Sequence, residues 1–567
     1  MKKSLIILLL TAFVIASYSS SEASAVSKYS EAQSPLGKKK LFKRMKAYFR
    51  YRDADYNGAL RIYREIYENN TSDAKICYLM GKCHVQLQNM DEAISFLSKA
   101  KKLDPDVAKD LHFLFGEAYQ YLGNLDSAII EYSAYKSSLK GGQLKNNPVV
   151  EVLSQTETAK NLMEHPVNVT IKNLGLDINS EFDDGMPSIT ADGKTLILTS
   201  RRPDTKGGGI DPNTGQYYDD IYLATWNDEK NKWNEAEDVE GDLNTTGHDA
   251  CLSISPDGST IYVYRNIPKI TGSGDIFYST KRPDGKWTNP KSIAKPLNSS
   301  FFESSACIAP DGSAMYFVSE RNGSLGNADI WRSKKLGKNV WEKPVNLGPV
   351  VNTEDDELGV FIHPDGKTLF FTSKGHGSMG GYDVFMTQMK ADSSWTDPVN
   401  LGYPINSTKD DIYFVMTADG KKAYVASRKD NGYGGADLYE IDMTKYTFPI
   451  KIQGQEATTV ETDLSILKGS VIESSAAQQL EAEIIIKDVT SGKETKLMSD
   501  ENGDFFVTLA GGKEYEITVD KAGYKKYDEK VTLPFDKDKT YTLVKLIVLE
   551  KLTEEKKEEE KKEDEKK

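Results

Sequence analysis

Five acidic residues stand at the same place in five copies of a repeated phrase. Each lies eight residues before the aspartate of an Asp-Gly pair, and together they are Asp184, Asp249, Glu303, Glu357 and Asp411. Carboxylates gathered into a ring at the mouth of a channel could bind a cation or the basic end of a peptide. A basic residue also follows each Asp-Gly pair, and these five are Arg201, Arg265, Arg321, Lys374 and Arg428. Because an unpaired buried charge is costly, the alternative is a structural set of ion pairs, which we favour.

The repeated phrase itself predicts the element that positions these acids. It reads "SISPDGSTIYVYRN" from Ser253 and "FIHPDGKTLFFTSK" from Phe361, with an alternating strand on each side of the Asp-Gly pair. Glycine accepts backbone angles that other residues resist, so the pair indicates a hairpin turn. The turn aspartates are Asp192, Asp257, Asp311, Asp365 and Asp419. We therefore expect each ring acid to begin the first strand of a hairpin.

Two further sets of residues follow the same repeat. Four tryptophans stand 54 residues apart and are expected to pack between neighbouring units, namely Trp233, Trp287, Trp341 and Trp395. An aspartate opens a later strand in every unit and is expected to accept hydrogen bonds from the preceding glycine-rich loop. This set is Asp220, Asp275, Asp329, Asp383 and Asp437. Four strands per unit, repeated over residues 166–445, predict an all-β propeller.

The number of blades follows from the two ends of this region. After Asp437 no tryptophan strand completes the fifth unit, but "HPVNVTIKNLGLDIN" from His165 echoes "EKPVNLGPVVN" from Glu342. We expect a strand at about residues 166–174 to complete the last blade and close a ring of five. The alternative is a sixth blade within residues 446–463.

Residues 38–165 carry a helical repeat. Ala59, Ala93 and Ala128 lie 34 and 35 residues apart, and Gly81 and Gly116 hold matching places before the last two. This is the order of the tetratricopeptide repeat (TPR), in which small residues let two antiparallel helices pack closely. The predicted α-helical solenoid offers a partner groove on the first helix of each unit. Its candidate contact residues are Tyr48, Tyr78, Lys82 and Tyr119.

The end of the chain has two parts. Residues 464–549 contain short strands and an Asn502-Gly503 hairpin signal, which predict a small β-sandwich. Residues 551–567 contain only Lys, Glu, Asp, Leu and Thr, which cannot build a core. We expect this charged tail to be disordered.

Composition narrows the class of protein. The first 25 residues have two lysines, a short apolar run and an Ala-Ser-Ala site, as in a secretory signal peptide. A net charge of −13 excludes a typical nucleic-acid binder, and no later apolar run is long enough to span a membrane. Four cysteines imply no disulfide framework, and we expect buried free thiols. No motif indicates a metal, a cofactor or catalysis.

Three resemblances extend this interpretation. The Asp-Gly units resemble the PD repeats of TolB-type envelope propellers. Gly469, Asp500, Gly503 and Tyr515 match a carboxypeptidase-regulatory-like domain, which is a non-catalytic, transthyretin-like sandwich. The order of signal peptide, TPR, propeller and sandwich resembles the PorE-like periplasmic proteins of Bacteroidetes, which are associated with type IX secretion.

The PorE-like resemblance implies a location and partners. It implies a periplasmic protein that associates with the outer membrane through envelope proteins, bound by the TPR groove and the propeller. PorE-like proteins end in an OmpA-like peptidoglycan-binding domain, whereas only the charged tail follows Glu550 here. Direct peptidoglycan binding is therefore not expected of this chain.

Three functions remain for the whole chain. We expect a non-enzymatic scaffold linked to type IX secretion. The main alternative is a sensor that binds a saccharide or a peptide on the propeller, and a hydrolase is the third. The propeller peptidases carry a G-x-S-x-G hydrolase domain, and this sequence has no such motif.

Overall fold

A computed structural model describes residues 35–552, apart from 146, 212–214, 266–273, 430, 448–459, 461, 476 and 537–539. The predicted signal peptide (1–25) and residues 553–567 of the predicted tail lie outside the described residues. The chain forms two compact units, Met1–Glu157 and Thr158–Lys567, which are described separately.

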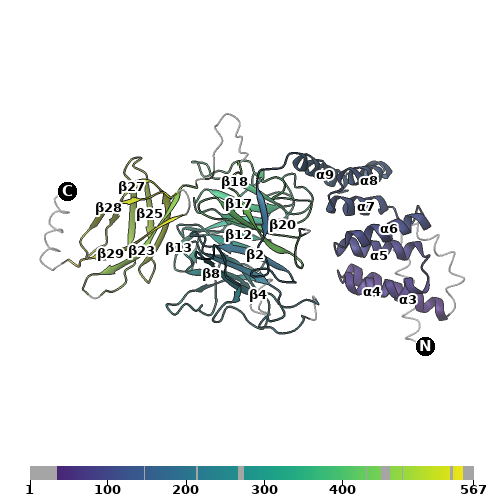
Figure 1. The fold of residues 1–567 in the computed structure, drawn as a ribbon, viewed down its shortest axis with the longest axis horizontal. Helices are drawn as coiled ribbons and strands as arrows, with labels where there is room; N and C mark the ends of the chain where they lie inside the picture. Colours follow the sequence, from purple (N-terminus) through teal and green to yellow (C-terminus); the bar gives the residue numbers. More distant parts are fainter. Residues whose placement is uncertain are drawn as a thin grey trace. The chain divides into compact units, whose positions relative to one another are not determined.

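Seven α-helices follow one another in the described N-terminal part, stacked in chain order (Figure 1). They are α3 (Pro35–Arg52), α4 (Tyr56–Asn69), α5 (Ala74–Gln86), α6 (Met90–Leu103), α7 (Leu111–Tyr121), α8 (Leu125–Ser138) and α9 (Val149–Glu164). A short 3-10 turn, η2 (Gly141–Gln143), precedes α9. Aspartate caps begin two of the helices, since Asp55 accepts from Gly58 N at 2.7 Å and Asp73 from Ile76 N at 3.2 Å.

Small residues set the spacing within each helix pair. A Cβ atom on Gly81 would lie 2.7 Å from Leu97 Cγ, and one on Gly116 would lie 2.4 Å from Tyr132 Cδ1. Ala59, one of the three repeat alanines, has an exposed fraction of 0%, as do the other two. The predicted reason for these residues is therefore confirmed, because the antiparallel helices approach too closely for larger side chains.

Five antiparallel sheets follow, and one of the ring acids begins the first strand of each. The first sheet has β2 (Asp184–Ile189), β3 (Thr195–Ser200), β4 (Asp220–Asn227), β5 (Lys232–Trp233) and β6 (Glu237–Asp238). The second has β7 (Asp249–Ile254), β8 (Thr260–Arg265), β9 (Asp275–Thr280) and β10 (Lys291–Ser292). The third has β11 (Glu303–Ile308), β12 (Ala314–Ser319), β13 (Asp329–Gly337), β14 (Val340–Trp341) and β15 (Val345–Asn346).

The last two sheets repeat this order. The fourth has β16 (Glu357–Ile362), β17 (Thr368–Ser373), β18 (Asp383–Gln388) and β19 (Val399–Asn400). The fifth has β20 (Asp411–Met416), β21 (Lys422–Ser427), β22 (Asp437–Asp442) and β1 (Thr170–Asn173). In every sheet the first two strands form the predicted hairpin. The five turn glycines have φ values of +64° to +77°, namely Gly193, Gly258, Gly312, Gly366 and Gly420.

The five sheets form a closed, propeller-like cycle. Their first strands contact one another in the order β2, β7, β11, β16, β20 and back to β2. The predicted closing strand is present but shorter than expected, since β1 pairs with β22 from Thr170 opposite Asp442 to Asn173 opposite Tyr439. Within the described residues no sixth sheet joins this cycle, while residues 448–459 and 461 of the alternative blade lie outside them.

The tryptophans lie between neighbouring sheets, as predicted. Trp233 of the first sheet packs with Tyr424 of the fifth, their ring centroids 6.0 Å apart, within one buried cluster. Trp395 of the fourth sheet approaches Tyr316 of the third in the same way at 6.2 Å. Each of the four repeat tryptophans is at most 8% exposed, so these side chains carry much of the apolar contact between sheets.

An asparagine that was not predicted links each sheet to the one before it. Asn244, just before β7, accepts from Ile221 N at 2.8 Å and donates to Ile221 O at 2.9 Å in the first sheet. Asn179 makes the same pair of bonds with Leu438 of the fifth sheet, at 2.8 and 3.0 Å. The sequence signal is an Asn-Ser or Asn-Thr pair four or five residues before each ring acid.

Two more sheets make up the C-terminal region. One pairs β26 (Asp504–Ala510), β23 (Leu464–Glu473) and β29 (Tyr541–Leu549), and the other pairs β25 (Glu494–Met498), β24 (Glu483–Asp488), β27 (Lys513–Val519) and β28 (Tyr527–Leu533). Buried side chains from both sheets form one cluster. The Asn502-Gly503 hairpin is present, with Gly503 at φ +74°.

The helices give one finding about membranes. Among those in the described residues, none is both long enough and apolar enough to cross a bilayer.

Ring closure predicts equal costs for two distant substitutions. Asn179→Ala leaves Leu438 N–H unpaired, while Leu438 O keeps its bond from Leu174 N. Asn298→Ala does the same at Ile276 in the second sheet, whose O keeps its bond from Ile293 N. Each should lower the free energy of unfolding by roughly 1–3 kcal/mol, because one buried backbone N–H loses its partner. Urea unfolding of both variants measures this. A negligible loss for Asn179→Ala beside a large loss for Asn298→Ala would contradict closure between the first and fifth sheets.

Candidate functional site

The five predicted ring acids share one environment. Each is the first residue of the first strand of its sheet, and each has an exposed fraction of 0%. A serine or threonine four residues earlier donates both its N–H and its hydroxyl to the carboxylate. In the first sheet Ser180 N and Oγ lie 2.6 and 2.8 Å from Asp184 Oδ2. The equivalent donors elsewhere are Thr245, Ser299, Thr353 and Ser407.

Four of the ring acids also contact a basic side chain. Arg265 Nε lies 2.9 Å from Asp249 Oδ1, and Arg321 Nη2 lies 3.1 Å from Glu303 Oε1, as expected. The carboxylates are thus enclosed by internal partners instead of being exposed at a channel mouth. This geometry favours the structural interpretation of the ring.

Two of the expected basic partners are wrong by one residue. Arg202 contacts Asp184 at 3.7 Å and Lys429 contacts Asp411 at 3.3 Å, where Arg201 and Arg428 were expected. The reason is the period of two along an extended chain. Ser200 is paired with Asp184 across the hairpin, so the side chain two residues later returns to the same side.

The fourth sheet departs from this pattern. The position equivalent to Arg202 is Gly375, and a Cβ atom there would lie 2.5 Å from Thr353 Oγ1. No basic side chain pairs with Glu357 among the described residues, which corrects the expected partner Lys374. Glu357 is bound only by uncharged donors, including Ser373 Oγ at 2.8 Å. Burial raises the pKa of its carboxyl to about 7.

The aspartates that open a later strand of each sheet accept hydrogen bonds from the preceding loop, as predicted, where that loop is described. Asp220 accepts from Lys206 N at 2.5 Å, and Asp383 from Met379 N at 2.8 Å. Asp329 and Asp437 make equivalent bonds. Burial raises the pKa of Asp220 to about 7, and that of Asp383 well above its ordinary value, with the Asp411 carboxylate adding to the latter shift. These aspartates hold the loops that precede their strands.

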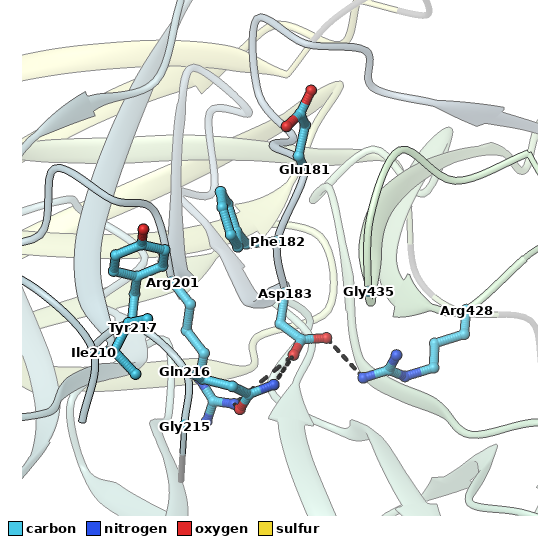
Figure 2. A pocket seen from close by; sticks show the side chains of 10 residues that line it. All are labelled: Glu181, Phe182, Asp183, Arg201, Ile210, Gly215, Gln216, Tyr217, Arg428 and Gly435. Atoms are coloured by element: carbon cyan, nitrogen blue, oxygen red, sulfur yellow. Dashed lines mark hydrogen bonds and ion pairs between the residues drawn. The ribbon is translucent and has the colours of Figure 1, made fainter. Parts of the chain in front are cut away.

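Arg201 and Arg428, which were expected to contact ring acids, both contact a different acid, Asp183. Figure 2 shows Asp183 between Arg201 and Arg428. Asp183 Oδ1 lies 2.7 Å from Arg428 Nη2, and its Oδ2 lies 3.8 Å from Arg201 Nη1. Arg201 also binds Asp219, with Nε 2.6 Å from Oδ1. The arginines therefore bracket a carboxylate that stands one residue before the ring acid Asp184.

A pocket opens beside Asp183. Its volume is about 410 Å³, and it lies between the loops of the first and fifth sheets. Figure 2 shows the ten residues that line it, which are Glu181, Phe182, Asp183, Arg201, Ile210, Gly215, Gln216, Tyr217, Arg428 and Gly435. The rings of Phe182 and Tyr217 form an apolar corner, with centroids 5.2 Å apart and planes at 89°. Charged groups and an exposed apolar wall thus face one cavity.

One long loop makes this pocket possible. The loop from Arg201 to Asp219 is about twice as long as its equivalents in the other four sheets. It explains the wider first gap in the repeat, but spacing alone did not identify it as a site. His248 fixes the loop, with Nδ1 2.7 Å from Asp219 Oδ2 and Nε2 3.4 Å from Asp211 Oδ2. This loop therefore makes the first sheet different from the other four.

The predicted groove residues lie on the first helices of the TPR pairs. Tyr48 is on α3 and 51% exposed. Tyr78 on α5 is buried, and its hydroxyl donates to Asp110 at 2.7 Å, while Lys82 Nζ lies 3.1 Å from Asp110 Oδ2. Tyr119 on α7 is half-buried and stacks on Phe115. Tyr78 is thus part of the helix packing, and Tyr48 is the most exposed aromatic side chain of this set, in edge-to-face contact with Phe49.

An acid that was not predicted adds to the groove. Glu117 on α7 carries a pKa raised to about 7, because burial outweighs the opposing effect of Lys82, and Asp110 raises it further. The Lys82 ammonium lies over the ring of Tyr51 on α3, 5.8 Å from the ring centroid. Aromatic, basic and acidic groups from α3, α5 and α7 therefore form one cluster along the first helices.

Comparisons with known proteins agree with the helical region. The tetratricopeptide repeat family matches residues 51–112. No curated protein matches the chain.

Solved structures match only distantly. A glycoside hydrolase is 10% identical, with 54% of this chain matching 99% of that one at a TM-score of 0.32. The Bacteroides ovatus protein "Xyloglucan PUL GH43B" is 12% identical, with coverages of 64% and 92% and a TM-score of 0.30. The 3-chlorocatechol 1,2-dioxygenase of Rhodococcus opacus 1CP is 11% identical, with 16% of this chain matching 61% of that one at a TM-score of 0.14. Likenesses this weak carry no inference about function.

The lack of a basic side chain beside Glu357, among the described residues, predicts that the stability of the fold depends on pH. Its folded pKa of about 7 exceeds its ordinary value of 4.5, so the folded state retains this proton while the unfolded state has lost it. The stability that this group contributes is present below about pH 4.5 and is lost as pH rises through 7, at about 1.4 kcal/mol per unit. Glu357→Gln should therefore reduce the fall in thermal midpoint between pH 5.5 and pH 8.

Glu303→Gln is the matched control for that experiment. This substitution removes the negative charge that pairs with Arg321, whose side chain is 11% exposed. It should lower the free energy of unfolding by about 3 kcal/mol at pH 8. Two results together would contradict this interpretation of Glu357 as a buried acid without a basic partner. Glu357→Gln would be as destabilising as Glu303→Gln at pH 8, and the pH dependence of its thermal midpoint would equal that of the parent.

His248 predicts a local effect on the long loop. His248→Ala removes both carboxylate contacts, so trypsin should cleave after the exposed Lys206 several times faster than in the parent. His165→Ala, at an exposed histidine outside the sheets, is the control and should leave cleavage unchanged. Mass spectrometry of timed digests measures both. Equal cleavage rates in the parent and His248→Ala would show that His248 does not hold the loop.

Proposed function

We propose that this chain is a non-enzymatic scaffold that binds protein partners along the first helices of its TPR region. The observation that carries this proposal is the tetratricopeptide match at residues 51–112, together with exposed aromatic residues on α3. Stacked helix pairs make extended binding surfaces, and tyrosine is a frequent energetic centre of protein interfaces. Tyr48, Phe49 and Phe42 are 51%, 39% and 70% exposed.

The rest of the fold supports a role as a frame. We propose that the five sheets are the blades of one closed propeller spanning residues 166–445. We propose further that residues 464–549 are a transthyretin-like sandwich of the carboxypeptidase-regulatory type. The ring acids support a structural role for the propeller centre, because their hydrogen bonds and ion pairs are made inside the molecule.

The cellular setting rests on the resemblance to PorE-like proteins. Residues 1–25 as a signal peptide would place the mature chain in the periplasm of a Bacteroidetes cell. Its association with the outer membrane would then depend on envelope partners, and its biological process would be type IX secretion.

A second candidate function has a specific observation in its favour. The pocket between the first and fifth sheets combines two arginines with an apolar corner, and its long loop interrupts the repeat. This arrangement supports a propeller that also binds a small ligand or a peptide, as in the sensor alternative.

The scaffold proposal predicts partner loss from one surface residue. Tyr48→Ala should lower the recovery of bound envelope proteins by about five- to thirtyfold, as expected for an interface tyrosine worth about 1–2 kcal/mol or more. Tyr433→Ala in the fifth sheet is the control, since that side chain is similarly exposed at 48%. Affinity purification from native membranes with quantitative mass spectrometry compares the two variants.

Two outcomes would count against the proposal. Equal partner recovery from both variants would show that Tyr48 and α3 are not part of the binding surface. Normal secretion of type IX cargo after deletion of the gene would end the secretion assignment and leave the ligand-binding alternative as the better account.

A further inference from the structure

Asp183 is the carboxylate that contacts Arg428 in the pocket between the first and fifth sheets. Asp183 Oδ1 already accepts from Arg428 Nη2 at 2.7 Å and from Ala436 N at 2.9 Å. Its Oδ2 accepts from Gln216 Nε2 at 3.2 Å. Glu181 also lines the pocket, but in Figure 2 its carboxylate points away from Arg428. Beside Arg428, therefore, most of the accepting capacity of Asp183 is already used.

Donor capacity remains on Arg428. Its guanidinium makes one bond, through Nη2 to Asp183, within the described part of the chain, and its side chain is 45% exposed. A guanidinium has five N–H donors in a planar fork, so the other donors can serve a second acceptor. Arg201 differs, because it already binds Asp219 through Nε and Nη2 and Gln216 through Nη1. Arg428 is thus the group in this pocket that is prepared to bind an anion.

The opposite wall is apolar. Phe182 and Tyr217 meet edge to face, and Ile210 beside them is 58% exposed. Exposed apolar surface next to a few directed polar groups is typical of ligand pockets. A volume of about 410 Å³ is near the lower end of such pockets, so the site accepts a short terminal segment and excludes a folded surface.

We propose that this pocket binds the C-terminal carboxylate of a peptide whose last side chain is apolar. The carboxylate would bind the free N–H groups of Arg428, which would then bridge it to Asp183, and the last side chain would pack against Phe182, Tyr217 and Ile210. Charge-assisted Arg–carboxylate contacts are short and directional, which suits recognition of a chain end. A neutral saccharide fits less well, because it carries no charge to pair with the guanidinium of Arg428. This inference belongs to the ligand-binding candidate and does not depend on the TPR surface.

A binding experiment on the full mature chain tests the proposal. The probe is acetyl-Gly-Ser-Phe with a free C-terminal carboxylate, compared with the same peptide as its C-terminal amide and with trigalacturonate. Saturation-transfer NMR and calorimetry measure binding. The free acid should bind saturably, and the amide should bind about tenfold more weakly or worse, because it loses the charged contact with Arg428.

Matched variants locate the site. Arg428→Gln should weaken the free acid about tenfold, whereas Arg282→Gln, at an arginine that is 44% exposed and also paired with one aspartate, should have no effect. If Arg428→Gln melts earlier than the parent, Arg428→Lys keeps the charge but loses the fork and should still weaken binding.

Several results would overturn the proposal. Equal affinity for the acid and the amide would exclude recognition of the carboxylate. Unchanged binding by Arg428→Gln would place the peptide elsewhere. Binding of trigalacturonate that depends on Arg428, without binding of the peptide, would assign the pocket to an acidic saccharide. None of these results bears on Tyr48, so a failure here is distinct from a failure of the scaffold proposal.

Discussion

A buried carboxylate begins the first strand of every sheet in the ring, and groups from the preceding loop and the neighbouring strand satisfy it. Removing a charge from water is costly unless several partners replace the solvent. The chain supplies them in a fixed order: a serine or threonine four residues earlier, and in four sheets a basic side chain. An asparagine just before the serine or threonine ties each of these loops to the preceding sheet, including Asn179 at the closure. The same few contacts thus set the loop shapes, join the sheets and close the cycle.

Differences between the sheets are informative because the contacts are otherwise so regular. Gly375 leaves no room for a basic side chain, so Glu357 is held by uncharged donors alone. The long loop after β3 is the second departure, and it creates a pocket where Arg201 and Arg428 meet Asp183. A symmetrical frame offers five equivalent surfaces, whereas a specific ligand needs one distinct surface. Binding on the ring is therefore expected where this loop lies.

The sequence predicted the elements better than the contacts between them. Hairpins, tryptophan packing and the closing strand follow from local turn chemistry and from a repeat of 54 residues, and the structure contains all three. The partners of Asp184 and Asp411 were misassigned by one residue, because spacing does not show on which side of the chain a residue lies beyond the strand end. The role of the recurring asparagines was missed because it depends on the neighbouring sheet. The pocket was missed because its residues come from three separate loops.

The central claim is that partners bind along the first helices of the TPR region, and in-cell photo-crosslinking tests it most directly. A photoreactive amino acid would replace Tyr48 on α3 in one strain and Ile130 on α8, which is 67% exposed, in another. Our account predicts a crosslinked envelope protein from position 48 and none from position 130, because α8 is the second helix of its pair. Crosslinks of equal yield from both positions, or crosslinks from position 130 alone, would contradict it.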